Sequence, residues 1–168
     1  MIVLGIDPGI SGAIATLTPS DFAAVLDMPV RQREGGGKLR NEIDPLALRD
    51  ELRRLVPADE KGLVVMESQH AFMGGGARVG SMASQASLAA TKATITTVCE
   101  LAGLAVHFVS PKTWQKSYGI AARGGETTKK QSLRIARELF GRGMCPLEKH
   151  DGRADALLIA RWALRNLT

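Results

Sequence analysis

Residues 2–9 read I-V-L-G-I-D-P-G, an apolar run that ends abruptly in the carboxylate of Asp7. Such a run favours a strand that is covered on both faces, and the pair Pro8-Gly9 supplies the turn residues that end it. Open α/β sheets keep their functional sites where strands end. We therefore expect Asp7 at the exit of a buried strand, although a capping or turn role explains this residue equally well on its own.

A second stretch repeats this pattern. Residues 63–66 read L-V-V-M and are followed directly by Glu67. Both predicted strands deliver a carboxylate at their end, and we expect the two strands to lie side by side with their acids at one edge of a sheet.

Two more acids lie near the start of a helix predicted over residues 150–167. Asp151 and Asp155 are four positions apart, which puts both side chains on one face of the helix. The helix dipole by itself favours acids in a first turn, so this pair decides little alone. Together with Asp7 and Glu67 it makes an all-oxygen site suited to Mg²⁺, with Mn²⁺ as a substitute.

The four carboxylates would repel one another without a cation and raise some of their own pKa values, whereas two divalent ions balance their formal charge. Two such ions, about 4 Å apart, catalyse in-line displacement at a phosphodiester. The carboxylates therefore predict a two-metal site for displacement at a phosphodiester.

The composition fits one domain over residues 1–168, with 45% hydrophobic and 23% charged residues. No apolar run approaches the roughly 20 residues of a transmembrane helix, and no basic signal segment opens the chain. We expect an intracellular protein with no membrane partner. Cys99 and Cys145 share no metal-ligand spacing, and we expect no disulfide.

A net charge of +5 suggests a polyanionic partner, and the distribution of the charge is more informative than its total. Residues 112–142 hold eight basic residues against two acidic ones. Phosphate contacts are expected there. The candidate DNA-binding lysines of this segment are Lys112, Lys116, Lys129 and Lys130.

Short strands are predicted over residues 12–17 and 22–28, and with the first strand they form an antiparallel meander. Residues 31–40 contain three glycines and four basic residues without periodicity, which predicts a mobile surface loop, either a solvated linker or a segment that touches DNA. Asp44-Pro45 predicts the start of a helix that ends before Pro57. Its apolar side is expected to hold Leu46, Leu48, Leu52 and Leu55.

The second half of the chain is predicted to be mostly helical. The small residues of the helix predicted over 81–101 allow close packing, against the sheet or against a second copy of the chain. Residues 106–109 predict a strand, 111–118 a short helix, and a basic helix begins at Thr127 or Thr128.

Five motifs resemble a known family. They are L-G-I-D-P-G with the later G-A, V-V-M-E with F-M-G-G-G, P-K-T-W-Q-K, T-K-K-Q-S and H-D-G-R-A-D-A-L-L-I-A. In this order, across nearly the whole chain, they look like the RuvC-type Holliday junction resolvases, including chloroplast and phage members. The resemblance implies a ribonuclease H-like α/β fold with a mixed five-stranded sheet flanked by helices. It also implies a homodimer that nicks four-way DNA junctions symmetrically, with two Mg²⁺ ions in each active site. For the location it implies a cytoplasmic protein, bacterial or phage-encoded, with an organellar relative as the alternative.

The resemblance assigns roles to single residues. Asp7, Glu67 and Asp155 match acids of the family. RuvC itself has its remaining acid three residues before the last, where this chain has Gly152, so Asp151 must substitute from four residues away, as chloroplast-like relatives allow. His150 is an assistant that positions or activates water, or else a solvated residue at a helix start.

Three further residues match family positions near the DNA. Lys112 and Lys129 match lysines beside the scissile strand, with solvated surface lysines as the alternative. Phe72 matches an aromatic that stacks at the junction centre, where a stacked base contributes about 1 to 3 kcal/mol. Trp114 is interpreted as the apolar anchor of a short helix in preference to a stacking residue.

Two other classes of protein are alternatives to a junction resolvase. A junction-binding architectural protein would keep this fold without cleavage, and the altered spacing of Asp151 keeps that alternative open. The acetate kinase, actin and hexokinase superfamily also opens with an Asp at a strand turn, but its members need two such domains, for which 168 residues leave no room.

Overall fold

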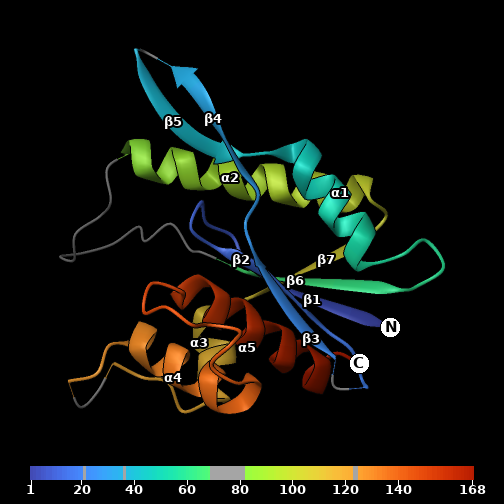
Figure 1. Cartoon of the computed structure of the whole chain (residues 1–168), viewed down its shortest axis with the longest axis vertical. Helices are drawn as coiled ribbons and strands as arrows, with labels where there is room; N and C mark the ends of the chain where they lie inside the picture. Colours follow the sequence, from blue (N-terminus) through green and yellow to red (C-terminus); the bar gives the residue numbers. More distant parts are fainter. Residues whose placement is uncertain (21, 36, 69–81, 123–124) are drawn as a thin grey trace.

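The computed structural model describes residues 1–20, 22–35, 37–68, 82–122 and 125–168. Its main sheet has the strand order β3-β2-β1-β6-β7 (Figure 1). The strands are β1 (Ile2–Asp7), β2 (Ala13–Leu17), β3 (Ala23–Asp27), β6 (Gly62–Glu67) and β7 (Ala105–Val109). The first three form the predicted antiparallel meander, whereas β6 runs parallel to both β1 and β7. The predicted mixed five-stranded sheet is therefore confirmed.

Helices cover both faces of the sheet (Figure 1). One face packs against α1 (Pro45–Leu55) and α2 (Met82–Leu101). The other packs against α3 (Pro111–Lys116), α4 (Thr128–Phe140) and α5 (Asp151–Asn166). Side chains of β1 alternate between the two cores, with Val3 in one and Leu4 and Ile6 in the other, all with no exposed surface. This explains why the opening run is continuously apolar.

Helix α5 lies unusually close to β1, and Gly5 is the reason. A Cβ atom added to Gly5 would lie 2.3 Å from the carbonyl oxygen of Ala156 and 2.8 Å from the Cβ of Ala160. Only glycine opposite small residues permits this approach. It brings the start of α5, with its acids, over the end of β1.

The helix boundaries follow the predicted caps. Asp44 accepts hydrogen bonds from the backbone amides of Leu46 and Ala47 at 3.0 Å each, and Thr127 caps α4. The apolar side expected for α1 is confirmed at Leu48 and Leu52, which are buried, and is wrong at Leu46, which is 59% exposed. At about 100° per residue, position 46 lies on nearly the opposite side of the helix from position 48. Among the described helices, none is both long and apolar enough to cross a membrane.

The expectation of a mobile loop over residues 31–40 is wrong. Strands β4 (Val30–Gly35) and β5 (Lys38–Ile43) form a separate antiparallel hairpin that projects from the body of the molecule (Figure 1). The hairpin lacks the apolar alternation on which strand prediction depends, because it packs little of either face on the core. Cross-strand pairs such as Arg31 with Glu42 replace that pattern.

Candidate active site

Asp7 and Glu67 come together because their strands are parallel neighbours. Ile6 of β1 is in register with Met66 of β6, so the acids that follow each of them lie at the same edge of the sheet. The α5 acids reach the same edge: Asp151 and Asp155 both interact electrostatically with Asp7. The structure thus gathers all four predicted carboxylates.

Gly152 explains the unusual spacing of the acids on α5. A Cβ at this position would lie 2.7 Å from the carbonyl oxygen of Ser11 and 3.0 Å from Oδ2 of Asp7. The first turn of α5 presses directly on the turn after β1, which leaves no room for a side chain at position 152. An acid there would collide with Asp7, and the preceding position, Asp151, is the one with space.

The electrostatics of the site oppose full ionisation. Burial, followed by the charges of Glu67 and Asp151, raises the pKa of Asp7 to about 7. Burial also raises the pKa of Asp155 to about 7, although nearby Ser132 opposes the shift. Carboxylates packed in this way are stabilised by a proton or by a cation.

Glu67 has a partner that the sequence did not reveal. The indole Nε1 of Trp114 donates a hydrogen bond of 2.8 Å to Oε2 of Glu67. Trp114 is fully buried, as expected of the anchor of α3, but it also orients the carboxylate. Burial raises the pKa of Glu67, and the Trp114 hydrogen bond works against that rise.

The donor set fits hard divalent cations. Oδ1 of Asp155 is buried and has no hydrogen-bond partner among the described residues, although buried carboxylate oxygens are nearly always paired. Four carboxylates supply the all-oxygen coordination that Mg²⁺ and Mn²⁺ prefer. As the described side chains lie, no three His, Cys, Asp or Glu residues close around a single metal position.

Lys129 supplies the positive charge at this edge. Its Nζ lies 2.5 Å from Oδ2 of Asp151, and this ion pair raises the pKa of Lys129. Asp7 and Asp155 add smaller contributions in the same direction. The basic helix α4 therefore brings one predicted DNA-binding lysine to the acids.

The fold has counterparts among solved structures. A structure of Thermus thermophilus RuvC in complex with a Holliday junction substrate matches with a TM-score of 0.58 and 16% identity, over 98% of this chain and 96% of that one. A second Thermus thermophilus RuvC structure matches with a TM-score of 0.56 and 19% identity over the same shares of the two chains. The chain has the ribonuclease H-like fold of RuvC. No protein-family model matches the sequence, and no curated protein matches it significantly.

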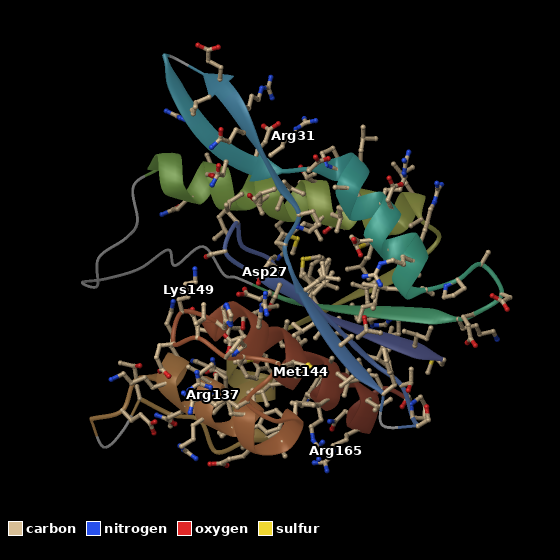
Figure 2. All side chains as sticks on the ribbon, in the orientation of Figure 1. Asp27, Arg31, Arg137, Met144, Lys149 and Arg165 are labelled. Atoms are coloured by element: carbon tan, nitrogen blue, oxygen red, sulfur yellow. The ribbon has the colours of Figure 1, made fainter. Side chains whose placement is uncertain are left out.

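Within this RuvC-like fold, a second pair of residues missed by sequence reasoning ties α5 to the sheet. Arg153 donates from Nε and Nη2 to the two carboxylate oxygens of Asp27, at 2.6 and 2.7 Å. Asp27 ends β3, and Figure 2 places it beside α5. Since Arg153 lies between the two acids of α5, this bidentate pair fixes their position over the strand ends.

The other predicted site residues are more scattered. The Nδ1 of His150 accepts a 3.3 Å hydrogen bond from the backbone amide of Leu147, and burial followed by the charge of Arg153 lowers the pKa of His150. Lys112 and Lys116 lie at the two ends of α3 with exposed side chains. Phe72 lies outside the described residues.

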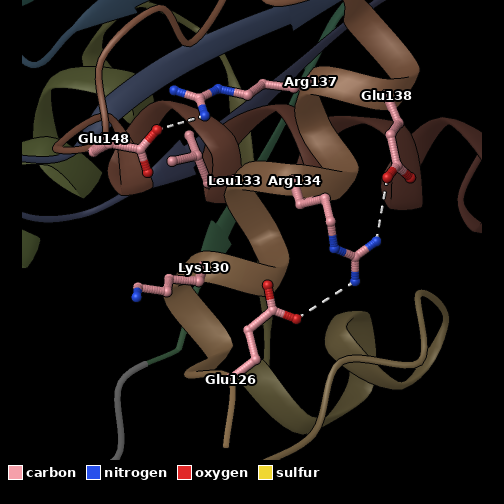
Figure 3. A pocket seen from close by; sticks show the side chains of 7 residues that line it. All are labelled: Glu126, Lys130, Leu133, Arg134, Arg137, Glu138 and Glu148. Atoms are coloured by element: carbon pink, nitrogen blue, oxygen red, sulfur yellow. Dashed lines mark hydrogen bonds and ion pairs between the residues drawn. The ribbon is translucent and has the colours of Figure 1, made fainter.

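Lys130 points to a different place from Lys129. It lines a shallow pocket of about 440 Å³ on α4 (Figure 3). The lining residues are Glu126, Lys130, Leu133, Arg134, Arg137, Glu138 and Glu148. Three acids balance three bases there, and ion pairs such as the 2.7 Å contact of Arg137 with Glu148 already neutralise them. The pocket therefore has no net charge with which to attract DNA.

Proposed function

We propose that this chain is a divalent-metal-dependent endodeoxyribonuclease that resolves four-way DNA junctions by paired symmetrical nicks. The proposal includes a cytoplasmic location and a relation to the chloroplast and phage members of the RuvC-type resolvases. The observation that carries the proposal is the gathering of Asp7, Glu67, Asp151 and Asp155 at one sheet edge, with a buried oxygen of Asp155 left without a donor. The fold shared with Thermus thermophilus RuvC, which has been solved with a Holliday junction, supports the choice of substrate.

In this proposal Asp7, Glu67 and Asp155 hold two Mg²⁺ ions, with Asp151 as the fourth ligand. The bound ions supply the activation of the attacking water and the stabilisation of the leaving 3′-oxygen. Trp114 and Arg153 keep the carboxylates in place through Glu67 and Asp27.

Lys129 has two alternative anionic partners in this scheme. Without DNA its ammonium group pairs with Asp151. A scissile phosphate would compete for the same ammonium group and release Asp151 for a cation. Lys112 and Lys116 add phosphate contacts further out, Phe72 stacks at the junction centre, and His150, whose pKa is lowered, positions the water.

Symmetrical cleavage needs two sites in fixed relation, so the proposal includes a two-fold homodimer. Helix α2 offers a face for it, because Ala86, Ala89, Ala90 and Ala93 are all exposed. Ala90→Arg should convert the dimer to a monomer in analytical ultracentrifugation. An unchanged sedimentation coefficient would place the interface elsewhere.

The second candidate is a junction-binding protein of the same fold that does not cut. Two observations favour it. Lys129 forms an ion pair with Asp151, and the described acids do not close around a single metal position as they lie. Metal-dependent nicking separates the two candidates.

The test is cleavage of a synthetic mobile four-way junction and a matched linear duplex, with Mg²⁺ or EDTA, by the wild type, Asp7→Asn and Asp151→Asn. Asp59→Asn, a change at an exposed turn, is the matched control. Paired nicks on the junction alone, lost in EDTA and in both site variants, support the resolvase. Activity that survives Asp151→Asn moves the site onto three acids, and tight binding without nicks in any divalent metal supports the architectural alternative.

A further inference from the structure

The β4–β5 hairpin carries a basic face. Residues directly opposed across an antiparallel pair share a face, and the register opposes Arg31 to Glu42 and Arg33 to Arg40. Among the side chains that the structure describes, one face thus takes three arginines and one glutamate. The other face takes Val30, Gln32, Glu34, Leu39, Asn41 and Ile43, none of them basic.

The positive charge on this face is only partly neutralised within the chain. Glu42 accepts a 2.9 Å hydrogen bond from Nε of Arg31 and contacts Arg33 at 3.5 Å. Its pKa is lowered, mainly by the Arg31 hydrogen bond. Arg40 has no hydrogen bond or ion pair within the described part of the chain, and it lies directly across from Arg33. Like charges directly opposite destabilise a strand pair, so the face favours an external anion.

Backbone hydrogen bonds hold the base of the hairpin beside the carboxylates. The Met28 amide donates to the carbonyl of Gly12 at 3.0 Å, and Gly12 belongs to the turn that follows Asp7. The Asp44 amide closes the base of the hairpin on the carbonyl of Pro29, also at 3.0 Å. Met28 and Ile43 are buried at this base. Figure 2 shows Asp27 at the foot of the hairpin and Arg31 further out along it.

The dimensions suit a DNA duplex. Strands of six residues extend about 20 Å at about 3.3 Å per residue. A two-stranded ribbon is narrow enough to lie in a major groove about 12 Å wide, and exposed arginines are well suited to phosphates. Arg33 is 72% exposed.

We propose that the β4–β5 hairpin is a DNA-binding arm, whose face of Arg31, Arg33 and Arg40 contacts the phosphates of a duplex arm beside the carboxylate site. This assignment rests on the proposed function in one respect, that the partner is DNA. It adds a contact surface on the duplex, separate from the junction centre and from the lysines of α3 and α4.

The test measures DNA binding in EDTA, where no cleavage can occur. A fluorescent four-way junction and a linear duplex are titrated with the wild type and Arg33→Ala/Arg40→Ala at about 50 to 200 mM salt. Each phosphate contact contributes about 0.9 to the slope of log K against log salt, so the slope should fall by about 2 for both DNAs. The double variant should lose affinity for the linear duplex as well as for the junction, because the arm contacts a duplex.

Two control variants separate the arm from a general effect of charge. Arg49→Ala/Arg54→Ala removes two arginines from α1, both ion-paired with neighbouring acids, and should leave the slope nearly unchanged. Gln32→Ala/Asn41→Ala alters the other face of the hairpin and should also leave it unchanged. If the α1 variant loses as much affinity as the hairpin variant, or the hairpin variant keeps the wild-type slope, the proposal is overturned.

Glu42→Gln tests the arm with a result that misfolding could not produce, because this variant should bind DNA more tightly than the wild type. Removing the carboxylate frees Arg31 and Arg33, so DNA binding should tighten and the slope should rise by about 1. Weaker or unchanged binding would contradict the assignment. Nicking in Mg²⁺ reports separately on the proposed function. If the hairpin variants change the salt slope but the wild type does not cut DNA, the DNA-binding arm is supported and the nuclease function is refuted. If the wild type cuts DNA but the hairpin variants leave the slope unchanged, or if the wild type binds no DNA in EDTA, the arm is refuted.

Discussion

Asp7→Asn should stabilise the metal-free protein at alkaline pH. The folded-state pKa of Asp7 is raised from 3.8 to about 7. A raised pKa means that the folded state holds the proton more tightly than the unfolded state does. The stabilising contribution of the protonated group is therefore fully present below about pH 4 and is lost as the pH rises through about 7. Asn carries no such dependence, because it does not ionise.

The magnitude follows from the shift. About three pKa units correspond to about 4 kcal/mol at about 1.4 kcal/mol per unit. Part of that energy is shared with Glu67 and Asp151, whose charges also raise the pKa, so we expect about 2 to 4 kcal/mol. For a chain of this size each kcal/mol shifts the melting temperature by about 2 to 4 °C, which gives a gain of roughly 4 to 16 °C at about pH 8.

The assay is thermal unfolding in EDTA, followed by circular dichroism at about pH 4 and pH 8 for the wild type, Asp7→Asn and the exposed control Asp59→Asn. The gain of Asp7→Asn over the wild type should be present at pH 8 and nearly absent at pH 4. Added Mg²⁺ should stabilise the wild type at pH 8 and have little effect on Asp7→Asn. A lower melting temperature for Asp7→Asn at pH 8, or the same gain at both pH values, would refute the reasoning.

Three further predictions concern the residues that position the acids. Trp114→Phe keeps a buried ring but leaves Glu67 without its donor, so the pKa of Glu67 should rise and the acid limb of the nicking-rate profile should move to higher pH. Gly152→Ala forces a Cβ against Ser11 and Asp7, and should cost roughly 1 to 3 kcal/mol in urea unfolding and lower the nicking rate, with DNA binding in EDTA retained. Asp27→Asn weakens the pair with Arg153. The pKa of Asp27 is lowered, mainly by the Arg153 hydrogen bond, and the Asp27 side chain is 64% exposed. The free energy of unfolding should therefore fall by about 0.5 to 1 kcal/mol at pH 7, and this loss should vanish near pH 2, where Asp27 is protonated. A loss that persists at pH 2 would show that the pair does not act through the charge of Asp27.

Sequence determined the elements that carry the candidate site. The strands ending in Asp7 and Glu67 were predictable because strands buried on both faces are continuously apolar, and the charge that ends each run stands out. The shared face of Asp151 and Asp155 followed from helical periodicity alone. Caps such as Asp44 and Thr127 act on their own backbone, so local sequence was enough to find them.

Only the tertiary structure decided what surrounds those acids. Trp114 lies 47 residues from Glu67, and Arg153 lies 126 residues from Asp27, so neither contact leaves a local pattern. Gly152 could be recognised as a departure from a motif, but its reason, the packing of α5 on the turn after β1, is a contact between distant segments. The hairpin escaped prediction for a related reason: its strands are held by cross-strand charge pairs and packed little on the core, and apolar periodicity, the main strand signal in a sequence, arises only from burial.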